Sequence, residues 1–138
     1  MTIKNRDDYI KYRFRRAEET FEEALLLAQN ERWNTVINRL YYSCFYAVIA
    51  LLLKHDIETQ SHDGAPTQFG LNFVKTGIID KENGKFFTKL FDYRQKGDYG
   101  DLYDYEEEIS RPLIEKTRIF LIEIEKLIKD TDNQGKHI

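Results

Sequence analysis

The chain has 138 residues, a length that favours one domain over two, and its 41% hydrophobic and 33% charged residues exclude wholesale disorder. Its 7 glycines and 2 prolines are too few for the many tight turns of a β-sandwich or a small barrel. A net charge of −3 argues against a dedicated duplex-binding module, and a single cysteine excludes a disulfide within the chain.

Helical periodicity organises the sequence, and its two clearest blocks come first. Apolar residues recur at three- and four-residue steps over residues 6–29, with charged residues between them, which predicts an amphipathic helix. The same spacing continues over residues 31–55 with almost no solvated positions. We therefore expect the second helix to be central and buried on more than one side.

The middle of the chain predicts a loop and a short helix. Residues 56–65 contain several turn-forming residues and read as a loop. A short helix is expected over residues 66–76, with Pro66 in its first turn and Gly77 as its C-terminal cap.

Two further helices complete the predicted fold. Asp80 should cap a helix over residues 81–96 that ends at Gly97. After an acidic, aromatic loop, the last helix should cover residues 106–129, and Pro112 should either place its start near Ser110 or kink it. We expect an all-α, up-down four-helix bundle with one short additional helix. It should form one domain over residues 1–138, with its core at about 8–128 and a polar tail at 130–138.

The sequence predicts a cytoplasmic protein with no membrane partner. Residues 1–6 lack the apolar core of a signal peptide, and the most apolar run, residues 48–53, is far shorter than a bilayer span. The lone Cys44 fits a reducing compartment.

Metal and phosphate-loop chemistry have no support in the sequence. None of His55, His62 and His137 follows a glutamate by three positions, the spacing that a di-iron bundle needs. No cysteine pair is available for zinc, and the glycines are scattered as at helix ends rather than gathered in a phosphate-binding loop. We expect no metal and no cofactor.

Arg94 is the most informative single residue. It follows Phe91, Leu90 and Phe87 by three, four and seven positions, which places it on the apolar face of its own helix. A guanidinium group keeps its charge, so a buried one must be paired or hydrogen-bonded. Two interpretations stay open: a structural ion pair with a carboxylate of residues 98–104, or an arginine that contacts a phosphate in a cleft or at a subunit interface.

Other polar residues carry weaker signals. His62, in a Ser-His-Asp-Gly loop, could act as a general acid or base, or its ring could simply pack on a helix end. The basic run of residues 11–16 is interpreted as a solvated face balanced by the glutamates that follow it. Four tyrosines gather near Arg94, a density that suits a protein interface or a single-stranded nucleic acid: Tyr93, Tyr99, Tyr103 and Tyr105.

Four segments of the sequence carry a family resemblance: Asn38-Arg39-Leu40-Tyr41-Tyr42-Ser43-Cys44-Phe45-Tyr46-Ala47, Ser61-His62-Asp63-Gly64, Phe73-Val74-Lys75-Thr76-Gly77, and Tyr93-Arg94 with Asp98-Tyr99-Gly100. Together they resemble the HEPN family (higher eukaryotes and prokaryotes nucleotide-binding), in its small single-domain bacterial and archaeal branch. The resemblance covers about residues 8–128.

The resemblance implies a helical bundle that forms a homodimer. Many members are ribonucleases of toxin–antitoxin or defence systems, often encoded beside a small nucleotidyltransferase that acts as antitoxin. Active members carry an arginine, four to six residues, and then a histidine, and two copies meet at the dimer interface and cleave RNA without a metal. Arg94 matches that arginine, and Tyr99 stands at the place of the histidine.

Three functions follow as hypotheses. In the first, the chain is a toxin-type endoribonuclease in which Arg94 stabilises the developing charge while Tyr99 or His62 transfers a proton. In the second, it is a non-catalytic HEPN module that binds RNA, a nucleotide or a partner nucleotidyltransferase. In the third, it is a helical scaffold with no site.

Overall fold

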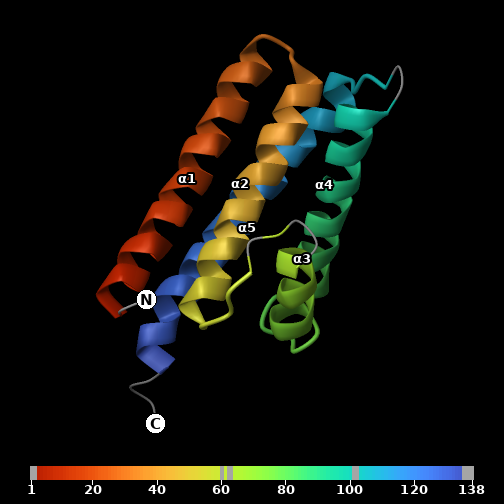
Figure 1. Cartoon of the computed structure of the whole chain (residues 1–138). Helices are drawn as coiled ribbons and strands as arrows, with labels where there is room; N and C mark the ends of the chain where they lie inside the picture. Colours follow the sequence, from red (N-terminus) through yellow and green to blue (C-terminus); the bar gives the residue numbers. More distant parts are fainter. Residues whose placement is uncertain (1–2, 60, 62–63, 101–102, 135–138) are drawn as a thin grey trace.

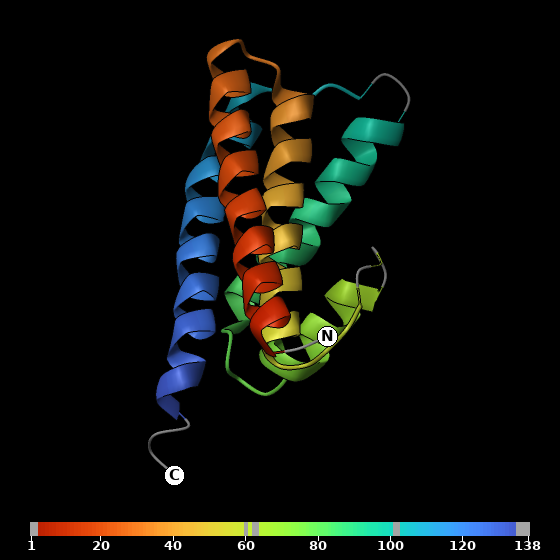
Figure 2. The ribbon, with the colours of Figure 1, turned by 60° about the vertical axis from the view of Figure 1, so that its left-hand side comes forward.

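The computed structural model describes residues 3–134 apart from residues 60, 62–63 and 101–102. Its elements are α1 (Ile3–Gln29), α2 (Trp33–Lys54), α3 (Gly64–Phe69), the π-helical turn η1 (Gly70–Val74), α4 (Lys81–Tyr99) and α5 (Glu107–Gln134). The four long helices lie side by side, and the short α3 packs at one end of the group (Figures 1 and 2). The described residues contain no strand. The predicted all-α four-helix bundle with a short additional helix is confirmed.

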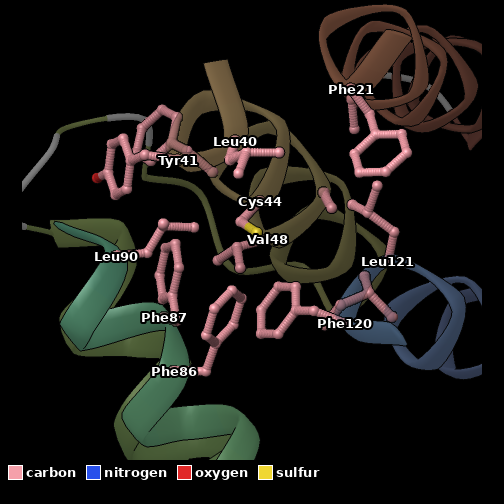
Figure 3. Packing of buried hydrophobic residues seen from close by; sticks show 14 of the residues in the cluster. Phe21, Leu40, Tyr41, Cys44, Val48, Phe86, Phe87, Leu90, Phe120 and Leu121 are labelled. Atoms are coloured by element: carbon pink, nitrogen blue, oxygen red, sulfur yellow. The ribbon is translucent and has the colours of Figure 1, made fainter. Parts of the chain in front are cut away.

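Helix α2 is the centre of the bundle, as its apolar sequence predicted. It packs against α1, α4, α5 and α3, so that nearly every side of it is covered. Phe86 and Phe87 of α4 and Phe120 of α5 converge on Cys44 and Val48 of α2 (Figure 3). Large aromatic side chains thus fill the space between three helices, which removes the most apolar area from water for each residue.

The apolar character of α2 has a packing explanation. The most apolar run of α2, residues 48–53, is too short to cross a bilayer. By length and average composition, however, α2 is the one helix among the described residues that could do so. Its neighbours in the bundle bury 78% of that apolar window. A central bundle helix needs this composition because it has partners on several sides.

The ends of α4 show one correct and one wrong prediction. Asp80 caps the helix as expected, since its carboxylate accepts a hydrogen bond from the Asn83 backbone N–H at 2.8 Å. The helix does not end at Gly97 but continues to Tyr99. At Gly97 a Cβ atom would lie 3.2 Å from Cε2 of Tyr105, so this glycine admits a neighbouring ring instead of ending the helix.

The other boundaries also differ from prediction. The helix expected over residues 66–76 starts two residues earlier and changes into the π-helical turn η1, after which Gly77 takes a left-handed φ of 83°. Helix α5 starts at Glu107, before Pro112, and runs to Gln134, so part of the predicted polar tail is helical. Pro112 is the sixth residue of α5, so the helix contains it and lacks the bond that a residue with an N–H would donate there to the carbonyl oxygen of Glu108.

Candidate functional site

Arg94 lies on the inner face of α4 inside a cage of aromatic rings. Its side chain is only 5% exposed. The guanidinium carbon lies 4.9 Å from the ring centroid of Tyr41, 5.3 Å from Phe91, 5.6 Å from Tyr42 and 5.9 Å from Tyr99. The electron-rich faces of these rings partly replace the water that such a cation loses on burial.

The nearest carboxylate compensates Arg94 only in part. Asp98, one helical turn later, places Oδ2 at 3.8 Å from Arg94 Nη1, which is an ion-pair distance but too long for a hydrogen bond. Arg94 Nε is buried, and no described residue accepts a hydrogen bond from it. The site therefore holds a permanent cation with an unsatisfied donor, a combination that suits an external anion.

A chain of polar contacts fixes Asp98 from α2. Asn38 Nδ2 donates to Asp98 Oδ2 at 2.8 Å. The side-chain oxygen Oδ1 of Asn38 accepts hydrogen bonds from Arg39 Nε and Nη2 at 3.1 and 2.8 Å, which fixes the orientation of the side-chain amide. Arg39 Nη1 lies 3.4 Å from Glu23 Oε1 on α1. Three helices therefore hold the carboxylate that faces Arg94.

Asn34 organises the chain that follows α4. Its Nδ2 donates to the carbonyl oxygens of Gly97 at 3.3 Å and Tyr103 at 2.8 Å, and its Oδ1 accepts from the Tyr105 N–H at 2.8 Å. The Tyr105 hydroxyl donates to the Tyr93 carbonyl at 2.9 Å. Burial, followed by the neighbouring Tyr103, raises the pKa of Tyr105, so this phenol serves as a structural donor.

Tyr99 is at the rim of the Arg94 cage. It is the last residue of α4 and is 74% exposed, so the structure brings Arg94 and Tyr99 together at the edge of the bundle. His62 falls outside the described residues, so its place relative to Arg94 stays a prediction. Tyr93 and Tyr105 lie against each other, with ring centroids 5.4 Å apart, rather than against Arg94.

Both interpretations of Arg94 have a structural counterpart. The ion pair with Asp98 is present, and the Nε–H of Arg94 is a donor that has no acceptor among the described residues and that a phosphate oxygen could satisfy. The sequence interpretation missed Asn34 and Asn38 as site residues. A pattern in the sequence could have indicated these site residues. An asparagine or a tyrosine recurs every four positions along an otherwise apolar helix: Asn34, Asn38, Tyr42 and Tyr46.

The basic run on α1 is not simply solvated, which corrects its interpretation as a solvent-facing surface. The guanidinium groups of Arg13 and Arg16 lie 6.0 and 5.8 Å from the ring centroid of Tyr46 on α2. The two arginines are partly buried. The sequence pattern could not place them, because their partner ring belongs to another helix.

Within the part of the chain that the structure describes, metal, thiol and His55 chemistry have little structural support. The described residues contain no cluster of histidine, cysteine and acidic side chains that could hold a metal ion. Cys44 is fully buried, and burial raises the pKa of its thiol, which removes it as a nucleophile. His55 packs edge-on against Phe73, and burial lowers its pKa.

Comparison with known proteins agrees with this architecture. The model of the HEPN domain matches residues 10–127. A UPF0332 protein of Thermotoga maritima is 44% identical over 93% of this chain and 97% of its own length. Two proteins of Methanocaldococcus jannaschii, each named "Putative toxin", are 33% identical; one match covers 82% of this chain and 77% of the relative, the other 83% and 84%.

The match to the family model spans most of the bundle, from the second turn of α1 to the later turns of α5. Relatives that carry a toxin name align with more than four-fifths of the chain. The chain therefore belongs to the HEPN domain family.

Proposed function

We propose that the chain is the toxin component of a toxin–antitoxin or defence system and acts on RNA as a metal-independent endoribonuclease in the cytoplasm. One observation carries this proposal: Arg94 is 5% exposed within four rings, and its Nε finds no acceptor among the described residues. A phosphate of the RNA backbone offers the negative charge and the oxygen acceptors that this guanidinium lacks. The toxin names of two relatives support the same biological role.

The proposed chemistry is attack by a ribose hydroxyl on its neighbouring phosphate. A bond forms between the 2′-oxygen and phosphorus while the bond from phosphorus to the 5′-oxygen of the next nucleotide breaks. The 2′-hydroxyl gives up a proton, and the leaving 5′-oxygen takes one. Arg94 stabilises the charge that develops on the phosphate, the Tyr99 hydroxyl donates to the leaving oxygen, and His62 is the candidate acceptor of the 2′ proton.

The proposed partners follow from the position of the site. Tyr99, 74% exposed, presents aromatic surface beside Arg94, and Tyr103, 42% exposed, lies against Tyr105 in the chain that follows α4. Exposed tyrosines with a nearby arginine are enriched at the centres of protein interfaces. We therefore place the homodimer contact at this end of the bundle, with a small nucleotidyltransferase antitoxin as the second partner.

The decisive experiment compares the wild-type chain with Arg94→Ala under induced expression. Growth arrest and RNA cleavage are expected for the wild type, with a fall in the cleavage rate of about 100-fold or more in the variant. Arg118→Ala is the matched control, since Arg118 also stacks on a ring (Phe21, 5.0 Å) and pairs with Glu115, yet lies on α5. Purified protein should cleave in the presence of a chelator and leave a 2′,3′-cyclic phosphate.

A second candidate function is a binding module without catalysis. Its support is that Tyr99 stands where active members have histidine, and that Asp98 already faces Arg94. A folded dimer that binds RNA through Arg94 but leaves it intact would establish this alternative and contradict the nuclease proposal.

A further inference from the structure

A continuous strip of arginine and tyrosine side chains leads away from Arg94 across the bundle. We call it the arginine–tyrosine strip; it consists of Arg94 on α4, Arg39, Tyr42 and Tyr46 on α2, and Tyr9, Arg13 and Arg16 on α1. We infer that this strip binds single-stranded RNA and guides it to Arg94. The inference rests on the proposed function, because it gives the RNA of that reaction a path over the protein.

The strip has no break between its two ends. The guanidinium carbon of Arg94 is 5.6 Å from the Tyr42 ring, and the Tyr42 and Tyr46 ring centroids are 6.1 Å apart. Tyr46 is 6.0 Å from the guanidinium of Arg13, which in turn lies 5.0 Å from the Tyr9 ring. Each contact is within the range of ring–ring or cation–ring attraction, so the members support one another.

The geometry of α2 explains why the strip crosses three helices. Residues four positions apart on a helix lie one above the other but drift around its axis, because four residues exceed one turn of 3.6. Asn38 faces the end of α4, Tyr42 contacts Arg94, and Tyr46, four residues further, contacts Arg13 on α1. Helices α1 and α4 flank α2 on its two sides (Figure 1). The four-residue spacing therefore carries the strip from one flank to the other.

The side chains of the strip suit a single-stranded nucleic acid. A guanidinium group has five N–H donors. Arg13 uses Nε and Nη2 on the Tyr9 hydroxyl at 3.2 and 2.6 Å, and Arg39 uses Nε and Nη2 on Asn38 Oδ1. A phosphate would bind at the guanidinium edges by joining or replacing such contacts. The rings and the flat guanidinium planes can also stack on unpaired bases. The Arg16 and Arg39 side chains are 35% and 28% exposed, so the strip is held in place by packing and still reachable.

Charge favours a polyanion over a second copy as the occupant. A two-fold contact centred on the α1 and α2 part of the strip would bring Arg13, Arg16 and Arg39 toward their copies on the partner, whereas the homodimer contact proposed above lies at the Arg94 end. The carboxylates that pair with Arg16 and Arg39 are Glu19 at 3.6 Å and Glu23 at 3.4 Å, and both are about half exposed. Such exposed pairs are weak and can give way to a phosphate.

The test measures binding of a fluorescein-labelled 2′-O-methyl oligouridylate, which has no attacking hydroxyl, to the full chain by fluorescence anisotropy. Arg13→Ala combined with Arg16→Ala should raise Kd about tenfold or more. The slope of log Kd against log salt should fall by about 1.4, because two phosphate contacts to a single strand are lost. Tyr46→Ala should raise Kd about tenfold, since it removes the ring under both arginines.

Arg118→Ala is again the matched control and should leave Kd and the salt slope unchanged, since α5 contributes nothing to the strip. The solution mass and the helical circular dichroism should be unchanged in every variant, while the urea midpoint of Tyr46→Ala should fall because its ring packs against the core. The inference is overturned if the double arginine variant binds RNA like Arg118→Ala. It is equally overturned if that variant turns a dimer into a monomer, because the strip would then be a protein interface.

Cleavage of unmodified RNA separates this inference from the proposed function. The double arginine variant should need about tenfold more RNA for half-maximal cleavage, whereas Arg94→Ala should lower the cleavage rate about 100-fold or more even at saturating RNA. Wild-type protein that binds through the strip without cleaving would support the strip and contradict the nuclease. A protein that loses cleavage with Arg94→Ala but binds RNA normally without Arg13 and Arg16 would support the nuclease and overturn the strip.

Discussion

Asn38 on α2 donates a 2.8 Å hydrogen bond to Asp98 Oδ2, and the same oxygen lies 3.8 Å from Arg94 Nη1. The carboxylate is thus shared between an amide donor on one helix and the buried guanidinium on another. Because Arg39 fixes the amide of Asn38 from the other side, Asp98 is held in one orientation. The position of the main counter-charge of Arg94 is therefore set by α2.

Asn38→Ala should lower the free energy of unfolding by about 1 kcal/mol, because it removes a hydrogen bond that joins two helices and ends on a carboxylate. Urea unfolding followed by circular dichroism measures the loss. Asn72→Ala is the control, since the Asn72 side chain donates to Gln68, one turn earlier on the same segment, and among the described residues joins no second long helix. A loss no greater than that of the control would show that Asn38 does not fix Asp98.

Residue spacing was enough to predict the helices and the inward position of Arg94. Three- and four-residue steps define the face that each helix buries, and they can be counted without tertiary information. Arg94 follows Phe87 and Leu90 on such a face, and both of those residues are buried. The resemblance of residues 38–47 to the HEPN family added the expected bundle topology.

Contacts between helices could not be predicted in the same way. Asn38 and Asp98 are 60 positions apart in the sequence. They meet because the packing of the bundle fixes how far α2 is shifted along its axis relative to α4. Arg13 and Arg16 were assigned to solvent for the same reason, since their ring partner, Tyr46, belongs to α2. A run of charged residues in the sequence does not indicate which aromatic side chain of another helix will pack against it.

The end of α4 shows how a local signal can be overridden. Glycine commonly follows the last residue of a helix, so Gly97 predicted an end. The missing Cβ instead leaves room for the Tyr105 ring, and the helix gains two further residues, Asp98 and Tyr99. The two extra residues are the ones that complete the surroundings of Arg94.

Asn34→Ala should loosen the chain after α4 and cost about 2 kcal/mol, because three hydrogen bonds end on this amide. The sharpest measurement is hydrogen exchange at the Tyr105 amide, which donates directly to Asn34 and should exchange much faster in the variant. Amides in the middle of α5 report on global unfolding and should change only by the loss of overall stability. Unchanged protection at Tyr105 would contradict this role for Asn34.

Two glycines should respond to alanine in opposite directions. At Gly84 a Cβ atom would lie 2.7 and 2.9 Å from the methyl carbons of Val74, a stiff β-branched side chain. Gly84→Ala should therefore lower the free energy of unfolding by about 1–3 kcal/mol. Gly70 has open space at its Cβ position, so Gly70→Ala should be neutral or stabilising by up to about 1 kcal/mol. Thermal unfolding of both variants tests this order, and a more stable Gly84→Ala protein would contradict it.

Glu18 should make stability depend on pH in a direction unusual for a carboxylate. Burial first, and then the charges of Glu125 and Glu22, raise its pKa above 4.5. A raised pKa means that the folded state holds the proton more tightly, so the ionised Glu18 destabilises the fold as pH rises above about 4.5. Glu18→Gln should therefore stabilise the protein by a few tenths of a kcal/mol at neutral pH, with the effect kept small by solvent screening.

The gain from Glu18→Gln should vanish below about pH 4, where the wild-type carboxyl is protonated in both the folded and the unfolded state. Urea midpoints measured at neutral and acidic pH give the comparison. Glu19→Gln is the matched control one residue away, because Glu19 pairs with Arg16 at 3.6 Å and its loss should bring no gain. If the two variants shift the midpoint equally at neutral pH, the burial and acidic neighbours of Glu18 do not destabilise its ionised form, and the prediction is wrong.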